Sequence, residues 1–108
     1  MATLRLVLVL SLALCCFKLV ADPNKQQLRI IALAPHIVEN LYTIGAGEQI
    51  VGTVEYADFP AAANDIPRIG GHQGIQIEKL LALKPDLVLA WKTGSKTEDL
   101  ARIKSFGI

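Results

Sequence analysis

The stretch LKPDLVLAW, residues 83–91, determines the predicted fold of this chain. Its centre, residues 87–90, is a short unbroken apolar run, which is typical of a strand that is covered on both faces. Pro85 prevents the preceding helix from continuing into that strand. Trp91 is therefore expected at the carboxyl end of a buried strand. In open parallel α/β sheets, ligands bind at that edge.

Strands and helices are predicted to alternate along the chain. Apolar runs at 28–34 and 50–54 predict two more strands, and the first is expected to end at Pro35. Helices are predicted over residues 38–44, 76–83 and 95–106. This alternation favours right-handed βαβ units and a parallel sheet flanked by helices, an α/β fold.

Local signals predict how some of these segments begin and end. Ser95 and Glu98 fit a capping box, in which each side chain satisfies a free backbone N–H at the start of the last helix. Residues 61–74 are predicted to be loop, with at most a short helical turn at 61–65. Ile108 is expected to begin a further strand.

The first 21 residues have the pattern of a secretory signal. Arg5 supplies a positive region, and residues 6–14 form an apolar stretch that is short for a membrane span. Cleavage after Ala21 is favoured, which makes residues 1–21 a signal peptide and residues 22–108 the exported chain. Lipidation at Cys15, in a sequence similar to a bacterial lipoprotein signal, is the alternative.

The composition of the exported chain excludes several kinds of site. Both cysteines, Cys15 and Cys16, precede the favoured cleavage point, so the remaining chain has no disulfide, thiolate nucleophile or Cys metal site. Removing Arg5 and Lys18 from the eleven basic residues leaves nine against ten acidic ones. Without a basic run, the chain lacks the clustered charge on which nucleic-acid binding depends.

Several ring side chains are predicted to share the edge at the carboxyl ends of the strands, called the rim below. Pro35 and His36, Tyr56 and Trp91 each follow a predicted strand, and the loop 70–74 brings His72 to the same edge. Aromatic faces offer a large contact area at a low entropy cost. The rim therefore favours a large planar ligand over a sugar or an ion.

Each of these residues also has a simpler interpretation. Tyr56 and Trp91 could only cover the end of the sheet, and the histidines could be ordinary surface residues. His36, Glu39 and His72 could instead form a zinc site, and with it a small metal-dependent enzyme, although their spacing does not support one. Glu78 is favoured by the helix dipole in the first turn of its helix.

Four segments resemble the amino-terminal lobe of the periplasmic cobalamin-binding proteins of ABC importers. They are residues 29–35, residues 56–60, Gln73-Gly74 followed by Ile77-Glu78, and residues 83–91. The Lys-Pro-Asp-Leu-Val core is shared with siderophore-binding and haem-binding relatives. Tyr56 and Trp91 indicate cobalamin more narrowly, and binding of haem or an iron siderophore on the same lobe is the alternative.

The resemblance implies a Rossmann-like lobe of a two-lobed periplasmic protein, with residues 22–108 as an incomplete, amino-terminal lobe. It implies a ligand that is captured and delivered to a membrane permease, with no cofactor and no catalysed reaction. Tyr56 and Trp91 would pack on the corrin ring, whereas His72 replaces a tryptophan of the family. Glu78 matches a glutamate that docks onto the permease.

Overall fold

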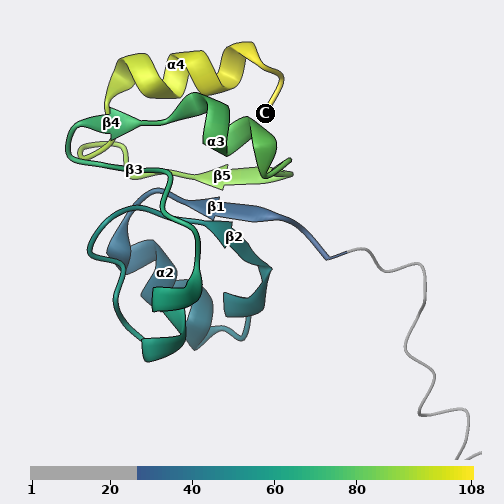
Figure 1. Cartoon of the computed structure of the whole chain (residues 1–108), viewed down its shortest axis with the longest axis vertical. Helices are drawn as coiled ribbons and strands as arrows, with labels where there is room; N and C mark the ends of the chain where they lie inside the picture. The colour runs from purple at the N-terminus through teal and green to yellow at the C-terminus, as the bar shows by residue number, and fades with distance from the viewer. Residues whose placement is uncertain (1–26) are drawn as a thin grey trace, which may run out of the picture.

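A parallel sheet of three strands forms the centre of the molecule (Figure 1). The computed structural model describes residues 27–108. The strands are β1 (Ile30–Ala32), β2 (Ile50–Gly52) and β5 (Leu87–Leu89), in the order β2-β1-β5. Ile30 of β1 lies opposite Ile50 on one side and Leu87 on the other. The predicted class, a parallel sheet flanked by helices, is confirmed.

Side chains of β1 alternate between two apolar clusters, one on each face of the sheet. Ile30 and Ala32 belong to the first cluster, and Ile31 belongs to the second together with Leu33, which follows β1. All four side chains are buried. The sheet is therefore the middle layer of three, and Figure 1 shows α2 on one side of the strands and α3 and α4 on the other.

Helix α2 (Pro35–Thr43) covers the first cluster with Val38 and Leu41. The helix begins three residues earlier than the sequence predicts, because Pro35 occupies its first turn, where the missing N–H costs no helical hydrogen bond. Pro35 therefore starts the helix, and the strand before it has already ended at Ala32.

Helices α3 (Ile77–Ala82) and α4 (Thr97–Ser105) cover the second cluster. Ile77, Leu80 and Ile103 are its buried helical members. Beyond α3, Lys84 takes the left-handed conformation, with φ of 49°, and Pro85 then directs the chain into β5. The predicted capping box is wrong, because α4 starts after Lys96 without a side-chain cap.

A short hairpin lies between β2 and α3, in the segment that the sequence predicts to be loop. Its strands are β3 (Gly70–Gly71) and β4 (Gly74–Ile75), and they are antiparallel. Residues 27–108 also contain two 3-10 helices, η1 (Gly47–Gln49) and η2 (Ala61–Asp65), the second at the predicted turn. Gly70 allows the hairpin to close, because a Cβ there would overlap the Gly74 carbonyl.

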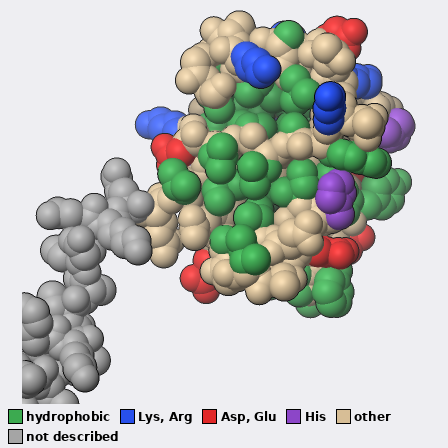
Figure 2. Space-filling model, turned by 180° about the vertical axis from the view of Figure 1, so that it is seen from behind, with side chains coloured by type: hydrophobic (Ala, Val, Ile, Leu, Met, Phe, Trp, Pro, Cys, Tyr) green, Lys and Arg blue, Asp and Glu red, His purple; other side chains and the backbone are tan. Residues whose placement is uncertain are grey.

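β5 is an edge strand in the part of the chain that the structure describes. Leu87 is 38% exposed, and Val88 and Leu89 are half-buried. Val88 packs against the second cluster and Leu89 against the first, so both faces are covered, but the prediction that this strand is fully buried is wrong for residues 27–108. Figure 2 shows hydrophobic side chains gathered over the middle of the face that it presents, beside the two histidines.

The amino ends of β1 and β5 are fastened to each other, on the side away from the rim. The Arg29 N–H donates to Asp86 Oδ2 at 2.8 Å, and the Asp86 N–H donates to the Arg29 carbonyl at 2.8 Å. The Arg29 guanidinium also donates to the Leu83 carbonyl. At the other end of the chain, Ile108 lies in no strand and packs against the second cluster.

Candidate functional site

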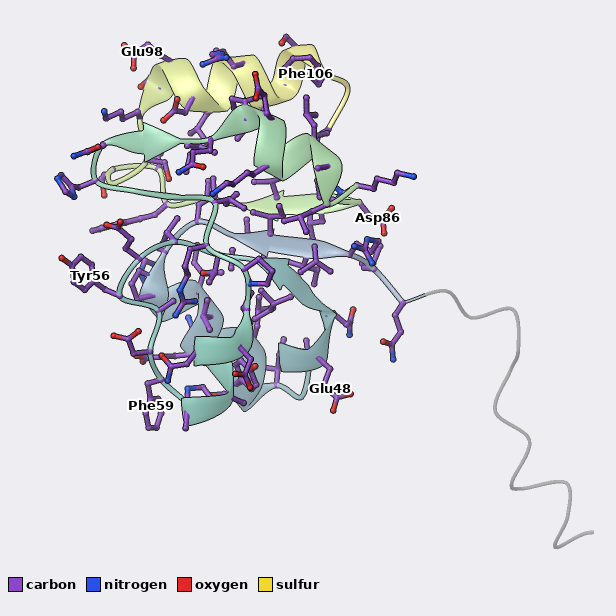
Figure 3. The ribbon with its side chains drawn as sticks, in the orientation of Figure 1. Glu48, Tyr56, Phe59, Asp86, Glu98 and Phe106 are labelled. Carbon is purple, nitrogen blue, oxygen red and sulfur yellow. The ribbon has the colours of Figure 1, made fainter. Side chains whose placement is uncertain are left out.

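The loops that follow the three parallel strands meet at the rim and enclose a cavity of about 350 Å³, called the rim cavity below. The β3–β4 hairpin and the start of α4 complete its walls. In Figure 3, Tyr56 lies at this edge, on the opposite side of the molecule from Asp86. The predicted site residues that line the cavity are Pro35, Tyr56, His72 and Trp91.

Trp91 forms one wall of the rim cavity and is held by contacts on several sides. The backbone N–H of Trp91 donates to Ser95 Oγ at 3.2 Å, and the backbone carbonyl of Trp91 accepts the Ser95 N–H at 2.8 Å. The indole lies so close over Gly94 that a Cβ at that position would overlap the ring. Although Trp91 is 51% exposed, its ring therefore packs closely against the turn that follows it.

His36 contacts the indole but does not line the cavity. It is the second residue of α2, and its ring meets that of Trp91 edge to face, with centroids 5.2 Å apart and an interplanar angle of 83°. Such aromatic pairs stabilise a fold by about 0.5 to 1.5 kcal/mol beyond the contribution of the area that they bury. The structure thus brings His36 to the rim, where it supports Trp91.

Tyr56 also lines the cavity and is 76% exposed. It follows β2 in a turn and takes the left-handed conformation, with φ of 68°, which is uncommon for a bulky residue. Thr53, at the end of β2, is fully buried, and its hydroxyl donates to the Ala32 carbonyl at 2.9 Å. This bond ties the start of the Tyr56 loop to β1.

His72 stands at the turn of the β3–β4 hairpin, beside Glu55. The distance from His72 Nδ1 to Glu55 Oε2 is 3.9 Å, and both side chains are more than half exposed. The Glu55 carboxylate lies against Gly71, where a Cβ would overlap it. These two residues form a polar pair on the wall of the cavity.

Three polar residues that the sequence did not single out as site residues also line the cavity. Ser95, Lys96 and Asp99 come from the start of α4, which leaves the same edge of the sheet as Trp91. The same reasoning from topology that placed Trp91 at the rim would have found them. The capping-box interpretation assigned Ser95 to the helix instead.

Glu78 does not line the rim cavity. It is exposed in the first turn of α3, beside Lys79, and borders a separate surface hollow with Arg102. Its docking role stays a prediction, as do the ligand contacts of the rim residues.

The alternative zinc site is not supported. His36 and Glu39 lie on α2, whereas His72 lies on the hairpin. Among residues 27–108, no three His, Cys, Asp or Glu side chains are grouped so that they could hold a metal ion. Within the same residues, no helix is both long and apolar enough to cross a bilayer.

Comparison with known proteins identifies similar sequences and folds. A vitamin B12-binding protein of Vibrio cholerae serotype O1 is 42% identical over 106 residues, which are 94% of this chain and 38% of the relative. A vitamin B12-binding protein of Pectobacterium atrosepticum is 38% identical over 106 residues, 98% of this chain and 37% of the relative. This chain thus spans a little over a third of the length of these relatives.

Solved structures show the same fold. The crystal structure of the periplasmic vitamin B12-binding protein of Vibrio cholerae superposes with a TM-score of 0.71 at 45% identity, over 74% of this chain and 31% of that one. A periplasmic haem-binding protein of Roseiflexus, in its apo form, superposes with a TM-score of 0.70 at 31% identity, over 77% of this chain and 32% of that one.

The sequence model of the family described as periplasmic binding protein matches residues 30–105, which include all three strands of the sheet and every residue that lines the rim cavity. The chain belongs to the periplasmic binding protein family.

Proposed function

We propose that this chain is the amino-terminal lobe of an ABC-importer substrate-binding protein and that its ligand is cobalamin. The observation that carries the proposal is the rim cavity, with the exposed rings of Tyr56 and Trp91 on its walls. The relatives that are vitamin B12-binding proteins support the choice of ligand.

The charges around the rim cavity favour a neutral ligand. Glu55 and Asp99 contribute two carboxylates, against one amine from Lys96. Lys96 and Asp99 are both hydrogen-bonded to backbone groups of the hairpin, which leaves their charges in place and the balance negative. The amide side chains of cobalamin can bond to carboxylates, whereas the propionates of haem would be repelled by them. On this wall, a corrinoid therefore fits better than a haem.

Capture would depend on ring packing, without a chemical step. The faces of Trp91 and Tyr56 would cover part of the corrin, Pro35 would extend the apolar wall, and His72 would face the ligand where the family has a larger ring. His36 would act through its contact with Trp91. Cobalamin is then cargo rather than a cofactor, and the chain is a binding protein rather than an enzyme.

The location and partner follow from the same proposal. Residues 1–21, which lie outside the described residues, would be a signal peptide, so that residues 22–108 reach the periplasm. Lipidation at Cys15 is the alternative there. After capture, Glu78 would dock the lobe onto the permease, for which its exposed position on α3 is suited.

Equilibrium dialysis tests the ligand. The whole chain is expressed, purified from the periplasmic fraction and dialysed against cobalamin, with hemin in a parallel cell. Saturable uptake of cobalamin is expected, and a folded protein that takes up neither compound would contradict the proposal for this chain. Recovery of the protein from the periplasm tests export in the same experiment.

Haem is the second candidate, because the haem-binding neighbour matches the fold almost as well as the cobalamin-binding one. Uptake of hemin alone, with a Soret band that changes on binding, would replace cobalamin by haem and leave the architecture intact.

Docking is tested with Glu78→Arg in an importer that contains this lobe. Transport should fall while ligand binding stays unchanged, because Glu78 lies outside the rim cavity. The neighbouring Lys79→Glu variant is the matched control for a change of charge on the same helix. Normal uptake by the Glu78→Arg variant would remove the residue from the docking surface.

A further inference from the structure

The start of α4 contacts both sides of the rim cavity. On one side, Ser95 exchanges two hydrogen bonds with the backbone of Trp91. On the other side, Lys96 Nζ donates to the Gln73 carbonyl at 3.0 Å, and Asp99 Oδ2 accepts the Ile75 N–H at 3.2 Å. Residues 95–99 therefore connect the Trp91 loop to the hairpin that carries His72.

The base and the turn of that hairpin are held by different contacts. At the base, the Gln76 N–H donates to the Ile69 carbonyl at 2.7 Å, and the Glu55 N–H donates to the Gly70 carbonyl at 2.9 Å. Among the side-chain hydrogen bonds of residues 27–108, those of Lys96 and Asp99 alone reach residues 70–75. The position of His72 at the turn thus depends on α4 as well as on Glu55, whose carboxylate lies against Gly71.

These side chains are not used to cap α4. Ser95 and Asp99 are residue types that satisfy free N–H groups at the start of a helix. Here the helix begins after Lys96 without a side-chain cap, and both residues bond to other segments instead. Lys96 holds the N-cap position, so the polar groups of Ser95 and Asp99 are free to bond to the walls of the cavity.

We infer that Ser95, Lys96 and Asp99 are positioning residues that set the separation between the Trp91 wall and the His72 wall of the rim cavity. The consequence for cobalamin rests on the proposed function, but the positioning itself is a property of the free protein. A preformed cavity binds more tightly because less ordering is needed when the ligand enters.

The chain contains its own reporters for each wall. It has two histidines and a single tryptophan. His36 packs on Trp91, whereas His72 lies on the hairpin. The imidazole NMR signals, assigned with a His36→Gln variant, therefore distinguish the two walls without any ligand, and Trp91 fluorescence reports on one of them.

The test uses the whole chain without ligand. Combined Lys96→Gln and Asp99→Ala should move the His72 signal and leave Trp91 emission unchanged. Ser95→Ala should shift Trp91 emission and the His36 signal and leave the His72 signal in place. Asp99→Asn, which keeps an accepting oxygen, should restore the His72 signal when combined with Lys96→Gln. Glu98→Ala, on the same exposed turn, is the matched control.

A His72 signal that is unchanged in the double variant would overturn the inference, as would an equal change in the Glu98→Ala control. Sharp, dispersed imidazole signals in each variant show that it is folded, so loss of structure is distinguishable from movement of one wall.

Dialysis against cobalamin then separates the inference from the proposed function. We expect about tenfold weaker binding by the double variant than by the unaltered chain. If the unaltered chain binds no cobalamin but the signals move as described, the proposed ligand fails and the positioning role stands. If cobalamin binds equally to both proteins and the signals do not move, the positioning role fails alone.

Discussion

The rim cavity and a second hollow beside β5 are both apolar, and they differ in the polar groups around them. The second hollow, called the side groove, lies between α2 and β5 and has a volume of about 310 Å³. It is lined by Ile37, Asn40, Leu41, Ile44, Leu89 and Ala90. Asn40 is the single polar residue of the side groove. The polar residues of the rim cavity include Glu55, His72, Lys96 and Asp99.

This difference separates two uses of apolar surface. Ligand sites combine apolar walls with a few polar groups that orient the ligand, and the rim cavity has both. The side groove has one such group, the Asn40 amide, and its floor is part of the first apolar cluster. Changes at the groove should therefore alter folding stability, and changes at the rim should alter binding.

The largest effect is expected on folding stability, from Leu41→Ala at the floor of the side groove. Leu41 is buried, so its truncation should lower the free energy of unfolding by about 2 to 5 kcal/mol. Chemical denaturation measures this loss, with exposed Leu28→Ala as the control. A loss as small as that of the control would show that the groove contributes little to the core.

Trp91→Ala should have the next largest effect, this time on binding. Cobalamin affinity should fall by about 1 to 3 kcal/mol, and the free energy of unfolding should fall less, by about 1 kcal/mol, because the half-exposed indole loses its edge-to-face pair with His36. Phe106→Ala is the matched control, since Phe106 is 54% exposed and lies outside the cavity. Equal affinities for cobalamin in the two variants would remove Trp91 from the site.

Tyr56→Asn should weaken binding by about 1 kcal/mol without loss of stability. Asparagine accepts the left-handed conformation more readily than tyrosine, so the free energy of unfolding should stay the same or rise. Paired dialysis and denaturation measurements check both parts. Tyr56→Phe keeps the ring and should bind nearly as well as the unaltered chain. A clear loss of stability in Tyr56→Asn would mean that the ring supports the fold.

The smallest effect on stability is expected for Ile44→Lys, at the exposed end of the side groove. Ile44 is 75% exposed, so the free energy of unfolding should change by less than about 0.5 kcal/mol. Binding of a hydrophobic dye to the chain should fall, because the charge interrupts the apolar surface. Ile44→Ala is the control, and a weakening of cobalamin binding specific to the lysine variant would contradict the separation of the two hollows.

The order of strands and loops could be predicted because it depends on local patterns. Apolar runs located β1, β2 and β5, and parallel topology then placed Pro35, Tyr56 and Trp91 at one edge. His72 was placed at the same edge because it lies in the glycine-rich loop 70–74, which leads into α3.

The remaining features depend on contacts between distant residues. An apolar run such as 87–89 has the same pattern in a central strand as in an edge strand, so the exposure of β5 could not be predicted. Ser95 had two partners available, the start of α4 and the backbone of Trp91, and local sequence could not decide between them. The hairpin strands contain two residues each, too few to show alternation.

The position of β1 in the middle of the sheet has a consequence for the timing of folding. Ile30 comes first in the sheet, yet its partners Ile50 and Leu87 follow much later in the chain. Such non-local pairing is slow, and the sheet cannot close until β5 has been synthesised. β1 can pair with β2 first, but its other edge stays unpaired until β5 has been made.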